Sequence, residues 1–484
     1  MYNRSYICGV KRQKQVILEN ITVEDYAAEG KSLAKVDGKV IFIEGAVPGD
    51  VVDVYLTKNK KDWAEGKTVH FKKYSPQRIK AFCAHFGTCG GCQWQMLPYE
   101  QQLFYKQKQV TDNLQRIAKV ELPAIMPIMN CQATTQYRNK LEYTFSNKKF
   151  IPDIEFRRMK AAGADTDAAV MQDVGGFHAK GIFDKVVEID VCHLQAEPSN
   201  LIRKAVAAFA RQNDLSFYDI KRKTGWLRNM LIRMATTGEL MVNIVIGYEA
   251  ADARIKLLDY LLEQFPSITT LLYTINTKVN DSLYDLEPVT YFGKGYIIEK
   301  LEDLRFKISP KSFFQTNTRQ AENLYRITRD FAELTGEQTV YDLYCGTGSI
   351  GIFVSGLAKK VIGVEVIPDA IKDANENALL NNIKHAAFFC GDTIKICDDV
   401  FFATHGKPDV IITDPPRMGM HEKLVQKLLE IQAPVIVYVS CNPATQARDL
   451  SLLGEKYSVE KIQPVDMFPH TLHIENVVQL KLKN

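Results

Sequence analysis

The segment from Thr339 to Ser349, Thr-Val-Tyr-Asp-Leu-Tyr-Cys-Gly-Thr-Gly-Ser, constrains the fold of this chain more than any other. It predicts a short buried strand, a Gly-x-Gly turn through Gly346 and Gly348, and a following helix, because glycine lets a backbone approach a nucleotide-like ligand closely. A second apolar run ends at Glu365, about 20 residues later, where such sheets place the carboxylate that holds ribose hydroxyls. The pair predicts an α/β domain of the Rossmann-like type.

Two further predicted strands end beside acidic residues. The run 386–390 is followed by Asp392, and the run 410–413 by Asp414 in Asp-Pro-Pro-Arg. Ligands of open α/β sheets gather outside the carboxyl ends of the strands, so we expect these carboxylates to share one rim with Tyr344 and Glu365. The turn also matches the dinucleotide pattern Gly-x-Gly-x-x-Gly. The extra acidic strand ends favour S-adenosylmethionine, a nucleoside with an amino acid tail, over a nicotinamide or flavin.

Cys441 follows another apolar run, 434–440, in the sequence Ser-Cys-Asn-Pro. A lone cysteine is more often a small buried hydrophobic residue than a nucleophile. Carbon 5 of a pyrimidine, however, accepts a methyl group only after a thiolate has added at carbon 6, and a general base must then remove the carbon 5 proton. Glu475 is the candidate base, with His470 and His473 as competitors. Uracil and cytosine need the same chemistry, so Cys441 and Glu475 do not indicate which of the two pyrimidines is methylated.

Five motifs together resemble those of the RNA (uracil-5)-methyltransferases, which act on ribosomal and transfer RNA. They are Ser-Phe-Phe-Gln-Thr-Asn, Asp-Leu-Tyr-Cys-Gly-Thr-Gly, Asp-Pro-Pro-Arg-x-Gly, Ser-Cys-Asn-Pro and His-Thr-Leu-His-Ile-Glu, in that family's order. The resemblance covers nearly the whole chain. It implies that Cys441 is the nucleophile, Glu475 the base, and Phe313 a ring that stacks on the flipped uracil beside Asp414.

The resemblance also implies the residues of the cofactor pocket, which the family places around the glycine turn and the strand ends. They are Gln315, Tyr344, Gly346, Gly348, Ser349, Glu365, Asp392 and Asp414. Ser349 and Asp392 stand where asparagine is expected in close bacterial relatives, and both keep hydrogen-bonding ability.

A second group of cysteines indicates a metal. Cys83, Cys89 and Cys92 lie in one Gly-rich loop, and Cys192 is the best candidate for a fourth ligand. Four thiolates suit an iron–sulfur cluster, whereas structural zinc would accept His85 or His193 as readily. The resemblance to the ribosomal branch of the family implies a 4Fe-4S cluster, which we expect to be structural. Ten cysteines without a secretion signal argue for a reducing compartment.

The N-terminal region is basic and β-rich. Residues 1–120 hold 19 Lys and Arg against 12 Asp and Glu, although the net charge of the whole chain is only +4. Short apolar runs at 40–43, 51–56 and 68–71 alternate with turns such as Val-Pro-Gly-Asp50, which predicts a small barrel. The stretch 29–38 resembles the TRAM domain, an OB-like RNA-binding module, with Trp63 as a candidate stacking ring. A basic strip here is best used to neutralise phosphates.

These observations predict an α/β enzyme of three domains. We expect a TRAM-like barrel over 12–75, a central α+β RNA-binding domain with the metal loop over 76–315, and a Rossmann-like methyltransferase domain over 316–484. No apolar run approaches the ~18 residues of a membrane span. We expect a cytoplasmic protein, and we expect it to be a monomer.

The expected activity is methylation of a uridine in 23S ribosomal RNA, because the transfer-RNA branch of the family generally lacks the TRAM-like module and the metal loop. A tRNA (uracil-5)-methyltransferase is the alternative within the family. A ribosome assembly protein that binds RNA through a vestigial site is the alternative from another class.

Overall fold

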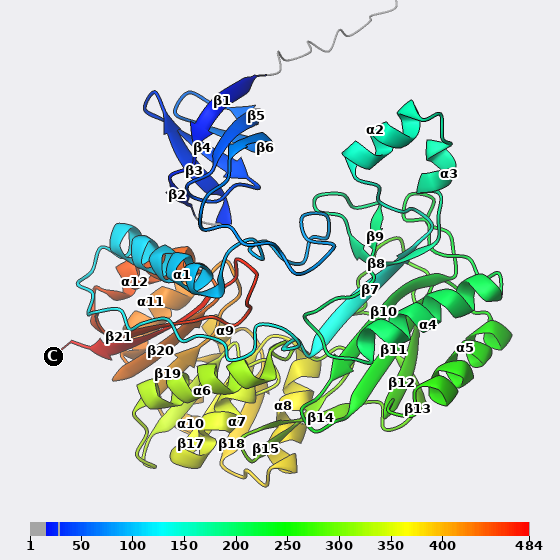
Figure 1. The fold of residues 1–484 in the computed structure, drawn as a ribbon. Coiled ribbons are helices and arrows are strands. Elements are labelled where there is room, and N and C mark those ends of the chain that lie inside the picture. The colour runs from blue at the N-terminus through cyan, green and yellow to red at the C-terminus, as the bar shows by residue number, and fades with distance from the viewer. Residues whose placement is uncertain (1–15, 28–29, 484) are drawn as a thin grey trace, which may run out of the picture. The chain divides into compact units, whose positions relative to one another are not determined.

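The computed structural model describes residues 16–27 and 30–483. Cys8, Glu29 and the predicted start of the TRAM-like barrel at residue 12 lie outside these ranges. The chain divides into two compact units, the first reaching Ala81 and including Gln95–Gln101, and the second formed by Phe82–Trp94 and Gln102–Asn484 (Figure 1). No helix in the described ranges is long and apolar enough to cross a membrane.

The first unit is a six-stranded sheet in the order β1-β5-β6-β4-β3-β2. Its strands are β1 Ile17–Thr22, β2 Asp25–Tyr26, β3 Ser32–Val36, β4 Lys39–Glu44, β5 Val51–Asn59 and β6 Trp63–Lys73. Alternate residues such as Ile41 and Ile43 are buried in its core, as expected of strands with one covered face. The buried Asp50 accepts hydrogen bonds from the Val47 and Ser75 backbone, at 2.8 Å each, and from Arg78.

The second unit contains a central seven-stranded sheet in the order β13-β12-β11-β10-β7-β8-β9. Helices α4 (Ser199–Gln212) and α5 (Ala251–Gln264) bury apolar residues against it. Strands β11 and β12 are parallel and joined through α5, whereas β10 and β11 form an antiparallel hairpin. The strands are β7 Lys140–Ser146, β8 Val174–His178, β9 Val186–Glu188, β10 Leu227–Met234, β11 Leu240–Ile246, β12 Thr270–Ile275 and β13 Val289–Phe292.

A second seven-stranded sheet follows in the order β18-β17-β16-β19-β20-β22-β21. Strands β16 Thr339–Leu343, β17 Lys360–Glu365, β18 Ala386–Cys390, β19 Val410–Thr413 and β20 Val435–Ser440 are parallel. Strand β22 (Glu475–Leu482) runs antiparallel to β20 and to β21 (Tyr457–Val465). This is the doubly wound α/β fold with an antiparallel end that the sequence predicts.

Helices cover both faces of this sheet, and neighbouring strand residues contribute to opposite cores. Val340 packs in the core with α6, α7 and α8, and Tyr341 in the core with α1, α11 and α12. The helices are α1 Tyr99–Asn113, α6 Thr318–Ala332, α7 Ser349–Val354, α8 Pro368–Leu380, α11 Glu422–Ile431 and α12 Pro443–Leu453. Smaller elements are η2 Leu114–Ala118, α2 Asp153–Ala161, α3 Thr166–Val170, β14 Ile297–Leu301, β15 Leu304–Ile308, η3 Ser355–Leu357, α9 Thr393–Ile396 and α10 Asp399–His405.

A buried ion pair joins α1 to the segment between β21 and β22. The Lys106 Nζ lies 2.6 Å from Asp466 Oδ1 and donates to the Phe468 carbonyl at 3.1 Å. Both side chains are fully buried. Removing one partner of such a pair strands an uncompensated charge in a medium of low dielectric constant.

Lys106→Met is therefore expected to lower the free energy of unfolding by about 3–5 kcal/mol. The double variant Lys106→Met with Asp466→Leu should recover most of that loss. Lys108→Met is the control, because Lys108 lies on the same helix and pairs with Asp112 at the surface, where such pairs contribute under ~1 kcal/mol. Urea unfolding measures all three, and equal losses for Lys106→Met and Lys108→Met would contradict the role of the buried pair.

Candidate active site

The register of the parallel strands brings three of the predicted side chains to one level. Leu343 pairs with Val364 on one side and with Thr413 on the other. The next residues are Tyr344, Glu365 and Asp414, which therefore end three adjacent strands at the same rim. The sequence predicts that Tyr344, Glu365 and Asp414 share one polar rim, and the observed register of the strands places these three residues at the same rim.

The glycines of the turn have different tasks. Gly346 has a φ of +53°, and a Cβ built there would meet nothing within 4 Å. At Gly348, with a φ of +74°, a Cβ would lie 2.9 Å from the Phe388 ring, so this glycine permits packing. Gly346 therefore leaves open backbone on which a ligand can rest.

The carboxylate of Glu365 is held firmly beside this turn. It accepts hydrogen bonds from the backbone N–H groups of Gly346 at 3.3 Å, Val366 at 2.8 Å and Ile367 at 3.1 Å. A fixed acceptor beside an open glycine fits the ribose and adenine of a nucleoside. The turn and rim are thus suited to S-adenosylmethionine, which would supply the methyl group.

The remaining predicted cofactor residues lie in the segments around the turn. Gln315 is buried, and its carbonyl accepts from Asn139 Nδ2 at 2.9 Å. Ser349 begins α7, and its Oγ lies 2.9 Å from the Tyr325 hydroxyl. Asp392 caps α9, where its Oδ1 accepts from the Ile394 N–H at 3.0 Å. Each of the three residues therefore makes at least one hydrogen bond to a neighbouring residue.

Phe313, the predicted stacking ring, is 72% exposed. Its carbonyl accepts a hydrogen bond from Thr347 Oγ1 at 3.5 Å, which links the segment before Gln315 to the glycine turn. An exposed ring beside the turn is free to stack on a planar partner.

Cys441 and Glu475 are brought together by antiparallel pairing. Ser440, the last residue of β20, pairs with Asn476, so the next pair in the register is Cys441 with Glu475. Cys441 is half-buried, and Glu475 is only 5% exposed. Asn442 caps α12 through its Oδ1 and the Ala444 N–H at 3.1 Å, which fixes the backbone after the thiol.

The groups around the thiol disfavour negative charge. Burial raises the pKa of Cys441 to about 12, and the nearby Glu475 and Asp414 add to the rise. Burial, with Asp414 beside it, also raises the pKa of Glu475 well above its usual range, and burial raises that of Asp414 to about 7. Arg417 is the nearby cation that lowers the pKa of both Cys441 and Glu475.

The two competing histidines have other contacts. His470 is buried, its Nδ1 lies 3.1 Å from Gln102 Nε2, and its carbonyl accepts from the Gln93 N–H at 2.9 Å. His473 Nδ1 lies 2.9 Å from Arg417 Nη2. Burial lowers the pKa of each imidazole to about 4. These contacts favour a structural role for both histidines. Glu475 therefore remains the candidate general base.

Two residues that the sequence analysis missed line the same region. Asp342 is fully buried in β16, and burial raises its pKa to about 7, although its Oδ2 accepts from the Gly351 N–H at 2.8 Å. Tyr325, on α6, is buried and contacts Ser349. The sequence signal that could have identified Asp342 is its place in the motif Asp-Leu-Tyr-Cys-Gly-Thr-Gly. For Tyr325 there is no such signal, because no rule of residue spacing connects α6 to the glycine turn.

The predicted metal site is not supported. Cys89 and Cys192 pack against the same small cluster, and burial raises the pKa of Cys89 to about 11, with Cys192 and Cys83 adding to the rise. Across residues 16–27 and 30–483, however, no group of three or more His, Cys, Asp or Glu residues is arranged to hold a metal ion. The metal site at Cys83, Cys89, Cys92 and Cys192 therefore stays a prediction. His85 Nε2 instead accepts from the Asp190 N–H at 2.8 Å.

Known families match both ends of the chain. The TRAM domain matches residues 17–69, and the family tRNA (Uracil-5-)-methyltransferase matches residues 399–483, which include Asp414, Cys441 and Glu475.

Whole-chain relatives agree. An uncharacterized RNA methyltransferase of Bacteroides thetaiotaomicron is 52% identical over 94% of this chain and all of its own length. A relative of the same description from Chlorobaculum tepidum is 38% identical over 97% of each chain. Among solved structures, the Pyrococcus abyssi tRNA (uracil-54, C5)-methyltransferase in complex with S-adenosyl-L-homocysteine superposes with a TM-score of 0.72. It is 28% identical and covers 95% of this chain and 100% of its own. The chain therefore belongs to the TRAM-containing family of RNA (uracil-5)-methyltransferases.

Proposed function

We propose that this protein transfers a methyl group from S-adenosylmethionine to carbon 5 of a uridine in RNA, through a transient bond between Cys441 and carbon 6 of the base. The observation that carries the proposal is the register of β20 and β22, in which Ser440 pairs with Asn476, so that Cys441 and Glu475 are the next residues along the two strands. The effect of Glu475 on the pKa of Cys441 supports their proximity. A nucleophile and a base on the same side of a rim are what this substitution requires.

The roles follow from the chemistry of uracil. The Cys441 thiolate adds to carbon 6, and the electron pair of the carbon 5–carbon 6 double bond moves onto carbon 5 and the adjacent carbonyl at carbon 4. Carbon 5 then takes the methyl group. Glu475 accepts the carbon 5 proton, the double bond re-forms, and the carbon 6–sulfur bond breaks to return the thiolate. The base must leave its stack to reach the rim, where the exposed Phe313 ring can pack on it.

The raised pKa of Glu475 suits this role. A carboxylate with a raised pKa is a stronger base than a solvated one, and burial, with Asp414 beside it, raises the pKa of Glu475. Arg417 supports both reacting groups, because its charge offsets the cost of a thiolate at Cys441 and of a carboxylate at Glu475. The intact pair argues against an RNA-binding assembly protein with a vestigial site.

Ribosomal RNA, specifically 23S, is the substrate we propose, as the sequence motifs predict. Transfer RNA is the second candidate, because the archaeal structure named for a transfer-RNA substrate covers 95% of this chain. The iron–sulfur cluster at the four cysteines stays a prediction, and no step of the proposal uses it.

Deleting the gene is expected to remove 5-methyluridine from 23S ribosomal RNA and to leave the level in transfer RNA unchanged. Mass spectrometry of nucleosides from the two purified RNA classes measures this, with the deletion strain carrying the wild-type gene as control. Loss in transfer RNA alone would establish the second candidate instead. Unchanged 5-methyluridine in both classes would contradict the proposed function.

Glu475→Gln is expected to trap the covalent intermediate, since the carbon 5 proton then has no acceptor and the carbon 6–sulfur bond cannot break. With S-adenosylmethionine and RNA present, a protein–RNA band should survive a denaturing gel and disappear with ribonuclease. The double variant Glu475→Gln with Cys441→Ala is the matched control and should show no band. A band of equal strength in the double variant would place the bond on another residue.

The rate of methyl transfer is expected to rise with pH between about 6 and 9. The pKa of Cys441 lies near 12 and that of Glu475 is raised, so the reactive deprotonated forms of both groups increase as pH rises. Arg417→Ala removes the cation that lowers both pKa values and should reduce kcat/KM at pH 7.5 about 10-fold, equivalent to about one pKa unit. Arg417→Lys should retain more activity. A rate that falls above pH 7 in the wild-type enzyme would contradict this assignment.

A further inference from the structure

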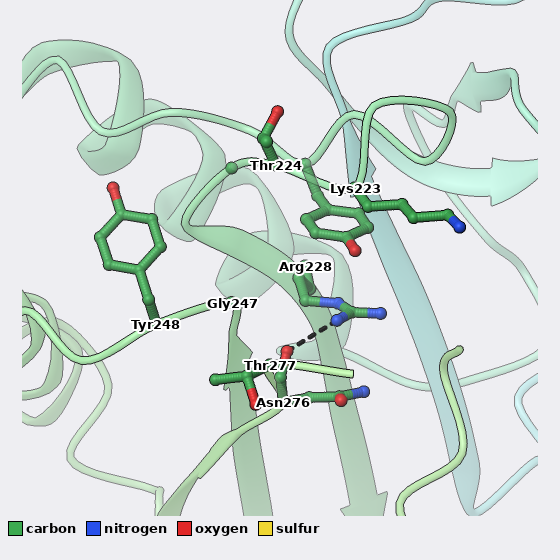
Figure 2. A pocket seen from close by; sticks show the side chains of 9 residues that line it. Lys223, Thr224, Arg228, Gly247, Tyr248, Asn276 and Thr277 are labelled. Carbon is green, nitrogen blue, oxygen red and sulfur yellow. Dashed lines mark hydrogen bonds between the residues drawn. The ribbon is translucent and has the colours of Figure 1, made fainter. Parts of the chain in front are cut away.

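A pocket of about 200 Å³ lies at the central sheet and is lined by residues other than those of the candidate active site (Figure 2). Gly247 directly follows β11 and Asn276 directly follows β12, and both line the pocket. These two strands are parallel, with Ile246 opposite Ile275. The pocket thus sits outside the carboxyl ends of adjacent parallel strands, the usual place for a ligand in an α/β unit.

Arg228 forms one wall of this pocket and is 1% exposed. Its two terminal nitrogens donate to the carbonyls of Asn276, Lys278 and Asn280 at 2.6 to 3.1 Å and to Asp281 Oδ1 at 2.6 Å. The guanidinium lies 4.0 Å from the centre of the Tyr218 ring. The fifth N–H, at Nε, has no hydrogen-bond partner among the described residues. The wall is therefore rigid and cationic, and it retains one unused donor.

The floor of the pocket is made of backbone. A Cβ at Gly247 would lie 2.2 Å from the carbonyl oxygen of Gly225, and one at Gly225 would lie 2.4 Å from that of Phe217. Side chains at either position would force these segments apart. The two glycines therefore let these backbone segments pack closely and form a compact floor beneath the pocket.

The rim carries an aromatic ring and a cation. Tyr248 is 49% exposed, and Lys223 is exposed at the end of the basic run Lys221-Arg222-Lys223. The loop is held by Asp219, which accepts from the Lys221 N–H at 2.9 Å and the Arg222 N–H at 3.0 Å. Lys221 pairs with Asp184 at 2.6 Å, whereas Lys223 has no carboxylate partner in the described part of the chain.

We propose that this pocket binds one unstacked nucleotide of the RNA substrate, with its base against Tyr248 and its phosphate at Lys223. The volume is below the roughly 300–1,000 Å³ of sites for drug-sized ligands and is suited to a single base. An exposed ring, an unpaired cation and a buried donor around one hollow match the π-face, phosphate and polar edge of a nucleotide. The proposal rests on RNA being the substrate, and it adds a contact separate from the methylated uridine.

Fluorescence anisotropy of the full-length protein with a fluorescein-labelled 20-nucleotide oligouridylate tests this site directly. Tyr248→Ala is expected to raise Kd about 10-fold, within the range found for loss of one base–aromatic stack, while Tyr248→Phe should stay within about 2-fold of wild type. Lys223→Asn removes the charge with a residue that tolerates the positive φ of this position. It should weaken binding and lower the slope of log Kd against log salt by about one. Lys256→Ala on α5 is the control for loss of an exposed lysine.

Crosslinking separates a direct contact from an indirect effect on folding. With 5-iodouridine in the same oligonucleotide, ultraviolet light should join RNA to the peptide that contains Tyr248, and Tyr248→Ala should lose that crosslink while keeping wild-type thermal stability. The proposal is overturned if the wild type does not bind the oligonucleotide, if both variants bind like wild type, or if crosslinks form only elsewhere. Neither readout uses methyl transfer, so both remain interpretable if the proposed methylation fails.

Discussion

The antiparallel pairing of β20 with β22 is the interaction on which the rest of the site depends. Ser440 opposite Asn476 sets the register, and a slip of one residue would turn Cys441 or Glu475 toward the other face of the sheet. The parallel strands could hold a cofactor rim without β22. They bring Asp414 near the thiol, whereas the second carboxyl, that of Glu475, comes from β22.

The segment that leads into β22 is held by residues far away in sequence. Lys106 fixes Asp466, Gln102 contacts His470, and the Tyr137 hydroxyl donates to the Pro469 carbonyl at 3.0 Å. The backbone of Gln93 and Trp94 donates to the His470 carbonyl as well. The cysteine-rich loop therefore supports the approach to Glu475 through ordinary hydrogen bonds.

The sequence predicted the rim well because each strand end carries its own local signal. Glycine at 346, an acidic residue at 365 and Asp-Pro-Pro after 413 are patterns with a direct backbone meaning, and the observed strands end where these patterns predict. The pairing of Ser349 with Tyr325 could not be predicted, because it joins α7 to a helix whose spacing carries no such signal. The raised pKa of Asp342 depends on burial from both faces of the sheet, which one strand cannot reveal.

Two other regions show what local patterns leave open. The small, polar stretch 161–169 is typical of a loop, yet Asp165 caps a short helix through the Asp167 and Ala168 N–H groups. The four cysteines were expected to converge because three share one loop. Convergence depends on where Cys192 lies relative to that loop, and the described residues show no metal-holding arrangement.

The most direct test of the thiol–carboxyl site follows the hydrogen that leaves carbon 5 and the methyl group that replaces it. RNA labelled with tritium at carbon 5 of uridine and S-adenosylmethionine labelled with carbon-14 in the methyl group should give one tritium released for each methyl group incorporated. Cys441→Ala should give neither. Methyl incorporation at the wild-type rate by Cys441→Ala, or incorporation without tritium release by the wild type, would contradict a covalent bond between Cys441 and the base.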